Sequence, residues 1–412
     1  MDSFKGSLDA VAACRAVARG VEAACPTACC DIVPMADGGE GTLDVLLASV
    51  GGRRCSAMVH DPLMRSIRAQ YGLLGVSDAE DAQDTELALH ADGSRGVGNM
   101  GGDEGCATAA EPGRVAVVEM ARASGLHYVD EQTRDPLRAS TFGTGELIRH
   151  ALDDGVRTII VTLGGSATND GGAGIAQALG ARLLDANGRD LESGGAALAR
   201  LDHIDTAHLD PRLADTVIRI ATDVTNPLTG PTGASAVFGP QKGATPAIRD
   251  ELEAGMAHYA QVVQDALGRD IASFPGAGAA GGLGAALGGV LGATLKSGID
   301  AVLDAVDFDK KLDGVSLAVT GEGRIDGQSV RFGKVPVGVA KRCAARGIPT
   351  VAIVGGIGEG AEGLYELCES TIQTTVSGPM SLEKAMQDAP ALYEQAADRL
   401  MRAIRIGMNL KG

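Results

Sequence analysis

The chain has 412 residues and a formal net charge of −17 at pH 7, which argues against a nucleic-acid partner or an anionic membrane surface. No apolar run reaches the roughly 18 residues of a membrane span, and eight irregularly spaced cysteines indicate reduced thiols in a cytoplasmic protein. The length allows two or three domains, and 59 glycines beside apolar runs predict many tight turns.

Strand-like and helix-like segments alternate along most of the chain. Short uncharged β-branched runs are typical of strands buried in a parallel sheet, and apolar residues three and four apart are typical of helices. In chain order we predict a helix over 11–24, a strand over 31–34, a helix over 43–49, strands over 115–120 and 158–163 separated by a helix ending at 153, a helix over 173–179, a strand over 217–222, a helix over 246–267, a strand over 316–320, a helix over 337–345, a strand over 350–354 and a helical region over 382–404. This pattern predicts a parallel α/β fold with ligands at the carboxyl ends of the strands.

Two segments differ from this pattern. Residues 53–74 alternate in polarity, which predicts a hairpin or meander that turns at Asp61-Pro62-Leu63. Residues 77–113 are acidic, rich in Gly, Ala and Asp, and poor in large apolar side chains. We therefore expect residues 77–113 to form a flexible, non-catalytic surface insertion.

A glycine-rich loop follows the predicted strand 158–163 and precedes the predicted helix 173–179. It contains Ser166, Thr168, Asn169 and Asp170 between glycines, an arrangement that can present N–H groups and polar side chains to an anion. It lacks the Lys-Ser/Thr ending of a Walker A motif and the glycine spacing of a dinucleotide fingerprint. The interpretations are a ligand site or an ordinary tight turn.

Carboxylates follow several of the predicted strands, and each could also be a helix cap. Such a group suits Mg²⁺, and a further carboxylate could accept a proton from an attacking hydroxyl. Lysines and arginines beside glycines could neutralise phosphates, as phosphoryl transfer requires. The carboxylates are Asp37, Glu40, Asp170, Asp223, Glu322 and Asp326, and the cations are Lys5, Lys242, Arg324 and Lys334. No Gly-x-Ser-x-Gly motif indicates serine-nucleophile chemistry.

Several motifs together resemble the type-1 glycerate kinase family, nearly end to end and in that family's order. They are Asp2-Ser-Phe-Lys-Gly-Ser, Ala36-Asp-Gly-Gly-Glu-Gly-Thr, Ser140-Thr-Phe-Gly-Thr-Gly-Glu-Leu-Ile, Gly164-Gly-Ser-Ala-Thr-Asn-Asp-Gly-Gly, Asp223-Val-Thr-Asn-Pro-Leu, Phe238-Gly-Pro-Gln-Lys-Gly-Ala, Pro275-Gly-Ala-Gly-Ala-Ala-Gly-Gly-Leu-Gly and Thr320-Gly-Glu-Gly-Arg-Ile-Asp. The resemblance implies transfer of a phosphoryl group from Mg-ATP to D-glycerate, giving 2-phosphoglycerate rather than 3-phosphoglycerate.

The resemblance also implies two α/β domains with the active site in a cleft between them. One is a Rossmann- or flavodoxin-like domain made from both chain ends, which we place at 1–58 and 288–412. The other is inserted at 59–287. We expect a cytoplasmic monomer or homodimer.

We assign site roles on this basis. Lys5 and Arg324 would clamp the substrate carboxylate or the transferring phosphoryl group, and Asp170 or Asp223 would orient or deprotonate the attacking hydroxyl. Asp37, Glu40 or Asp326 would hold Mg²⁺. The residues expected to bind substrate or ATP are Asp2, Ser3, Ser7, Gly38, Gly39, Thr141, Thr144, Gly165, Ser166, Thr168, Asn169, Asn226, Gln241, Lys242, Glu322 and Lys334.

The start of the sequence departs from the family pattern. Family members usually begin with a short apolar strand before the Asp-Ser-Phe-Lys motif, whereas here Met1 directly precedes Asp2. If this inner strand were missing, the strand beside it would have unpaired backbone groups, and the core would contain a gap. We therefore expect a start assigned too late or a truncated chain.

Two alternatives to a kinase remain. One is a non-catalytic hydroxy-acid or nucleotide binding protein, and the other is a dehydrogenase, which is disfavoured by the missing dinucleotide fingerprint.

Overall fold

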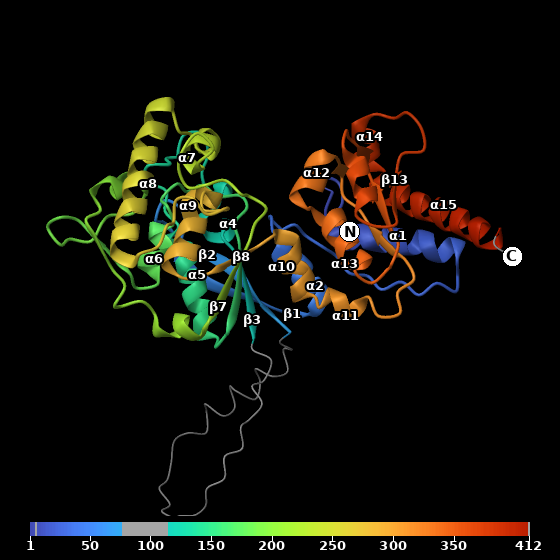
Figure 1. Cartoon of the computed structure of the whole chain (residues 1–412), viewed down its shortest axis with the longest axis horizontal. Helices are drawn as coiled ribbons and strands as arrows, with labels where there is room; N and C mark the ends of the chain where they lie inside the picture. The colour runs from blue at the N-terminus through green and yellow to red at the C-terminus, as the bar shows by residue number, and fades with distance from the viewer. Residues whose placement is uncertain (5, 76–113, 411–412) are drawn as a thin grey trace, which may run out of the picture.

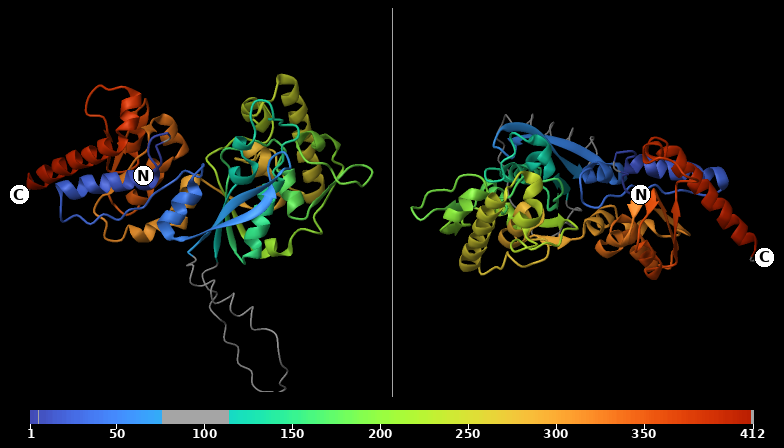
Figure 2. Two further views of the ribbon diagram at one scale, coloured as in Figure 1. Left: turned by 180° about the vertical axis from the view of Figure 1, so that it is seen from behind. Right: turned by 90° about the horizontal axis from the view of Figure 1, so that it is seen from above.

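The protein has two lobes, and both chain termini lie in the same one (Figures 1 and 2). A computed structural model describes residues 1–4, 6–75 and 114–410. The expected flexible insertion at 77–113 and the expected catalytic Lys5 therefore lie outside the described residues. Helices and parallel strands alternate in both lobes, which confirms the predicted α/β class.

A six-stranded sheet forms the centre of the lobe made from the middle of the chain. Its order is β1-β2-β3-β4-β7-β8, with bounds β1 (Gly52–His60), β2 (Ser66–Leu74), β3 (Val115–Glu119), β4 (Thr158–Thr162), β7 (Val217–Ala221) and β8 (Thr294–Lys296). The β1–β2 hairpin turns at the predicted Asp61 loop and is antiparallel, as is β2–β3. Within this sheet β3, β4, β7 and β8 are parallel to one another, so the loops that follow them lie at one edge of the sheet.

Helices cover both faces of this sheet because its central strands are apolar on both sides. Consecutive residues of β4 show this: Ile159 packs in a cluster with α5 (Phe142–Asp153) and α9 (Ala279–Ala285), whereas Ile160 packs with α2 (Thr42–Val50), α10 (Gly298–Ala305) and α13 (Val335–Ala344). The alternation follows from the two-residue period of a strand. In Figure 1, α2 and α10 lie where the two lobes meet.

A three-stranded parallel sheet forms the centre of the terminal lobe, in the order β13 (Ser370–Thr374), β11 (Thr350–Val354) and β9 (Ala318–Thr320). On one face, Ile353 packs with α1 (Ala10–Ala24) and α15 (Ala389–Asn409) from opposite ends of the chain. On the other, Val354 packs near α12 (Gly327–Phe332) and α13. A lobe made from both chain ends follows from these contacts.

The remaining α-helices and β-strands connect or flank the two sheets. They are α4 (Ala121–Ser124), α6 (Ala173–Ala178), α7 (Ala234–Phe238), α8 (Pro246–Leu267), α11 (Phe308–Lys311), α14 (Leu382–Gln387), β5 (Arg182–Leu184), β6 (His203–Asp205), β10 (Arg324–Ile325) and β12 (Gly356–Ile357). The predicted bounds of α8 are confirmed because both ends carry strong signals. Thr245 caps the first turn, Pro246 begins the helix, and Gly268 ends it in the left-handed conformation.

The predicted strand over 31–34 is wrong, since residues 31–34 form no strand. At the end of this segment Met35 N donates to Met1 O (2.9 Å), and the Pro34 carbonyl accepts from Ser49 Oγ (3.2 Å). Among the described strands β9 pairs with β11 alone, so its other edge is unpaired. A cavity of about 670 Å³ lies beside that edge, lined in part by Met1, Val33, Leu317 and Val319.

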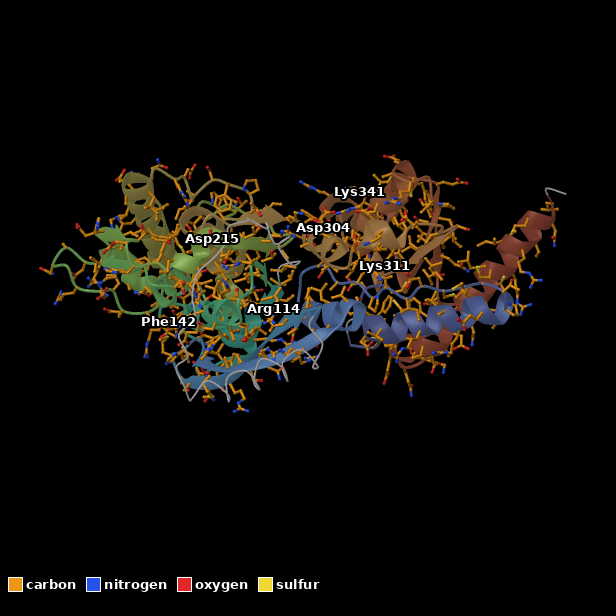
Figure 3. All side chains as sticks on the ribbon, turned by 90° about the horizontal axis from the view of Figure 1, so that it is seen from below. Arg114, Phe142, Asp215, Asp304, Lys311 and Lys341 are labelled. Carbon is orange, nitrogen blue, oxygen red and sulfur yellow. The ribbon has the colours of Figure 1, made fainter. Side chains whose placement is uncertain are left out.

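An ion-pair network ties the two lobes together. Asp304 of α10, labelled in Figure 3, pairs with Lys296 at the end of β8 and with Arg342 of α13, whose Nη2 lies 2.6 Å from Oδ1. The domain boundary expected at 58/59 falls inside β1. The boundary expected at 287/288 falls inside a short helical segment (Ala286–Val290) and leaves β8, a strand of the six-stranded sheet, on the terminal side. In the part of the chain that the structure describes, no helix combines the length and apolar character needed to cross a bilayer.

Candidate functional site

Loops from the two sheets meet at the junction of the lobes. The loop before α2 lies against the start of α10 so closely that a Cβ on Gly298 would come within 1.7 Å of the Asp37 carbonyl oxygen. The same N-terminal residue of α10 donates its backbone N–H to Asp223 Oδ1 (2.9 Å), just after β7. Glycine at Gly38 and Gly298 permits this approach. Asp37 and Asp223 therefore lie on two sides of one helix start.

Asp223 is partly buried, and its surroundings weaken its acidity. Burial raises the pKa of its carboxyl group to about 6, the Gly298 N–H bond lowers it, Asp37 raises it, and Lys334 lowers it. The Asp223 carboxylate is thus mostly ionised at pH 7 and yet basic enough to accept a proton.

Glu322 follows β9 in the terminal lobe and is only 5% exposed. Its Oε1 is buried without a hydrogen-bond partner among the described residues. Burial raises the pKa of its carboxyl group to about 7; the nearby Ser329 hydroxyl and Lys334 lower it, and Asp2 and Asp326 raise it. The Ser329 hydroxyl lies near but makes no hydrogen bond of ordinary geometry in the described structure. A buried carboxylate with one oxygen lacking a partner indicates a ligand position.

Lys334, immediately before α13, connects these two carboxylates. Its ammonium group lies close enough to Asp223 and to Glu322 to lower the pKa of each. Asp223 follows a strand of the middle lobe, whereas Glu322 and Lys334 belong to the terminal lobe. The group is therefore assembled only where the two lobes meet.

Arg324 and Asp326 extend this group. The Arg324 side chain is 70% exposed, and its Nε lies 3.7 Å from Asp326 Oδ2. Asp326 also caps α12, since its Oδ1 accepts from Gln328 N (3.0 Å) and Ser329 N (3.2 Å). Most of the Arg324 side chain remains free to meet an anion.

The glycine-rich loop after β4 reaches the junction only with its outer end. A Cβ on Gly164 would lie 3.3 Å from Gly39 Cα, and Gly165 is exposed. Deeper in the lobe, Asp170 is fully buried and accepts from Thr141 N (2.8 Å), Thr141 Oγ1 (2.9 Å), Gly172 N (3.1 Å) and Gly174 N (3.2 Å). Burial raises the pKa of the Asp170 carboxyl group, while these bonds lower it.

Most polar groups of the residues around Asp170 are also bonded inside the lobe, although Asn169 Oδ1 is buried without a partner among the described residues. Lys242, 1% exposed, donates from Nζ to Thr168 O (2.6 Å), and burial lowers its pKa to about 7, while Asp170 raises it. Thr168 Oγ1 donates to Ala280 O (3.3 Å), and Asn169 Nδ2 donates to Ser235 Oγ (2.9 Å). Ser166 and Thr144 are buried as well. In this conformation the structure does not bring these expected ligands to the junction.

Some of the other expected site residues line a cavity, and others are bonded within the protein or exposed elsewhere. Asp2, Ser3 and Glu40 line a cavity of about 540 Å³ beside the start of α1. Ser7 forms a turn with Phe4 (N to O, 2.8 Å), Asn226 Nδ2 donates to Thr232 O (2.8 Å), and Gln241 is exposed. Sequence reasoning missed Ser329, Gly298 and Asp300, which raises the pKa of Asp223. The helix cap Ser297 was the available signal for Gly298 and Asp300.

The junction offers oxygen ligands suited to Mg²⁺. No three His, Cys, Asp or Glu side chains among the described residues come together as a ready-made metal cage. Mg²⁺ needs only one or two carboxylates when substrate phosphates and waters complete its octahedron. Asp37 and Asp223, which repel each other, and the unpartnered Glu322 fit this requirement. Glu40 is more exposed, and Asp326 is engaged in capping α12.

Comparisons with known proteins cover the whole molecule. A sequence profile described as the glycerate kinase family matches residues 1–405. The chain is 43% identical to a glycerate kinase of Halalkalibacterium halodurans over 96% of this chain and 94% of the relative. It is 41% identical to a glycerate 2-kinase of Escherichia coli (strain K12) over 100% of this chain and 98% of the relative. A crystal structure from Salmonella typhimurium LT2, provisionally named glycerate kinase 2, aligns with a TM-score of 0.81 at 39% identity, over 99% of this chain and 97% of that one.

Proposed function

The chain belongs to the glycerate kinase family, and we propose that it transfers the γ-phosphoryl group of ATP to a hydroxyl of D-glycerate at the junction of its lobes. The observation that carries this proposal is that Lys334 lowers the pKa of both Asp223 and Glu322, two carboxylates that follow strands of different lobes. Phosphoryl transfer needs charge neutralisation and positioning more than covalent chemistry, and this arrangement offers both.

Substrate anions require local positive charge because the chain as a whole carries a net charge of −17. Arg324 is exposed at the junction and has a planar, forked guanidinium suited to a carboxylate or a phosphate. Lys334 is a compact point charge beside the two carboxylates. In our proposal Arg324 holds the glycerate carboxylate, and Lys334 lies against the transferring phosphoryl group. Lys5 is a further candidate cation outside the described residues.

Asp223 is the residue we assign to the attacking hydroxyl. Its carboxylate takes the hydroxyl proton as the oxygen–phosphorus bond forms and the bond to ADP breaks. A pKa of about 6 suits this task near neutral pH. We assign Asp170, the other candidate, to holding the starts of α5 and α6, because its two oxygens already accept four hydrogen bonds within the protein.

Mg²⁺, when bound, would neutralise phosphate charge, and Asp37 with Glu322 are the residues we expect to hold it. In this proposal Gly38 and Gly165, which carry no side chain, let the phosphates come close to the backbone, while the Gly39 N–H donates to Asp37 Oδ1 (3.1 Å). The buried positions of Thr168, Asn169 and Lys242 assign them to supporting these glycines from behind.

We propose 2-phosphoglycerate as the product, in line with the name of the Escherichia coli relative. The test is to incubate the chain with Mg-ATP and D-glycerate, follow ADP release, and identify the phosphorylated carbon by ³¹P NMR. ADP release that requires D-glycerate, with phosphate on C2, is the expected result. Phosphate on C3 would overturn the product assignment alone, and absence of turnover by the folded chain would overturn the kinase proposal.

A further inference from the structure

The loop after β12 lies directly against Arg324. Arg324 begins β10, whose partner β12 places Gly356 opposite it. Just beyond β12, Gly358 N donates to Ile325 O (2.7 Å), and Gly327 N donates to Glu359 O (2.8 Å). These two bonds fix the backbone of Gly358 beside the Arg324 and Asp326 side chains.

A side chain has no room at Gly358. A Cβ there would lie 2.8 Å from Asp326 Cβ, 3.0 Å from Arg324 Nη2 and 3.2 Å from Arg324 Nε. Favourable contacts between non-bonded carbon atoms are about 3.5–4.0 Å. Gly358 does not have a left-handed backbone, whereas Gly360 has φ +79°. Contact with Arg324 and Asp326, and not backbone conformation, is therefore what calls for glycine here.

We propose that Gly358 is a positioning residue for Arg324: its bare Cα is the surface on which the guanidinium rests, beside Asp326 and facing the junction. The inference rests on the proposed role of Arg324 in binding a substrate anion. An added methyl group would press on two side chains that differ in freedom. Asp326 is held by its two capping bonds to α12, so its contact is relieved only by a small shift of the Gly358 backbone. The two Arg324 contacts are relieved by movement of the flexible end of that side chain, which is the larger displacement.

The same strand provides a matched control. Gly356 lies two residues earlier and has no left-handed backbone. A Cβ added there would meet no described residue within 4 Å, apart from its two neighbours in the chain. Replacing either glycine by alanine removes the same chain entropy from the unfolded state. A difference between Gly356→Ala and Gly358→Ala therefore reports the contact with Arg324 and Asp326.

The test is a double-mutant cycle on glycerate phosphorylation, with kcat and KM measured for wild type, Gly356→Ala, Gly358→Ala, Arg324→Ala and the Arg324→Ala/Gly358→Ala pair. We expect Gly358→Ala to lower kcat/KM by about 10- to 100-fold, because small misplacements of a binding group have effects of this size. Gly356→Ala should change it by less than about twofold. In the Arg324→Ala background, Gly358→Ala should have a much smaller effect, because only its contact with Asp326 remains.

The cycle separates the inference from its premise. Suppose that Arg324→Ala lowers kcat/KM, and that Gly358→Ala lowers kcat/KM by the same factor in the wild type and in the Arg324→Ala variant. The two residues then act independently, and the inference is overturned. If Arg324→Ala leaves kcat/KM unchanged, the proposed role of Arg324 fails first. Thermal unfolding of each variant checks that any loss is not a loss of folded protein.

Discussion

Asp170 and Glu322 are two buried carboxylates, each in a glycine-containing loop that follows a strand, and their partners differ completely. Asp170 accepts four hydrogen bonds from Thr141, Gly172 and Gly174. Glu322 leaves Oε1 without any partner among the described residues and has its pKa raised to about 7. A buried carboxylate whose partners are all internal holds the fold together, whereas one without them costs stability that a ligand can recover.

The contrast extends to the residues around each carboxylate. Lys242, beside Asp170, donates its ammonium group to a backbone carbonyl inside the middle lobe. Lys334, beside Glu322, is half-buried at the junction and also faces Asp223 from the other lobe. The Asp170 side of the molecule is a support, and the Asp223–Glu322 side is where we place the chemistry.

Replacing Asp223 should have the largest effect on catalysis. Asp223→Asn keeps an oxygen for the Gly298 N–H but cannot take a proton, so kcat should fall by about 10²- to 10⁴-fold. Steady-state assays at equal concentrations of folded protein measure this. The thermal midpoint at pH 8 should stay the same or rise, because the variant removes a partly buried charge. Activity of Asp223→Asn within tenfold of wild type would contradict the assignment of the chemistry to the Asp223–Glu322 side.

Replacing Asp170 should instead reduce stability. An asparagine can keep the three donors at Oδ2 only by turning its amide nitrogen toward Gly172 N–H, which leaves that buried donor without an acceptor. Such a loss costs about 1–3 kcal/mol. Urea unfolding of Asp170→Asn should show a lower midpoint, with kcat of the folded protein within a few-fold of wild type. A large loss of kcat at unchanged stability would assign Asp170 to the chemistry.

The pH dependence of kcat/KM for Mg-ATP, measured with glycerate well below saturation, should report the raised acids of the free enzyme. Asp223 and Glu322 must both be ionised in our proposal, so kcat/KM should rise between about pH 5 and 8, with apparent pKa values near 6 and 7. The pH profile of the residual activity of Glu322→Gln should show only the lower of the two apparent pKa values. A profile already flat above pH 5 would show carboxylates of ordinary acidity.

Glu322→Gln should also stabilise the protein at alkaline pH, and this is the smallest of the expected effects. The folded pKa of Glu322, about 7, lies above its ordinary value of 4.5. The stability associated with this group is therefore fully present below pH 4.5 and is lost as the pH rises through about 7. The variant cannot ionise, so its thermal midpoint should exceed that of wild type at pH 8 and match it near pH 4.5. A lower midpoint at pH 8 would show that the Glu322 charge is satisfied.

The sequence predicted the strands and helices that depend on local signals. β11 and α8 were predicted with their observed bounds because a buried β-branched run and paired helix caps define them. The segment 31–34 has the composition of a strand but no partner on the side of β9, and strand formation depends on that partner. β13 was missed because Ser370–Thr374 is partly polar and is a strand only beside β11.

The candidate site was predictable as a set of residues but not as an arrangement. Asp223, Glu322, Arg324 and Lys334 stand out because they follow strands or adjoin glycines. Their separation from Asp170 and Lys242 could not be predicted, since burial and bonding depend on which segments pack behind the loop. Thr141 and Ser235 are the partners that enclose Asp170 and Asn169, and they come from distant parts of the chain.

The contrast between the two carboxylate sites is tested most directly by ¹³C NMR of the chain labelled at aspartate Cγ, titrated with Mg²⁺ and ADP. Asp223→Asn and Asp170→Asn each remove one signal and so assign it. We expect the Asp223 signal to shift with added Mg-ADP and the Asp170 signal to stay in place. A shift of Asp170 with Asp223 unmoved would show that the ligand binds at the glycine-rich turn, and would contradict the account.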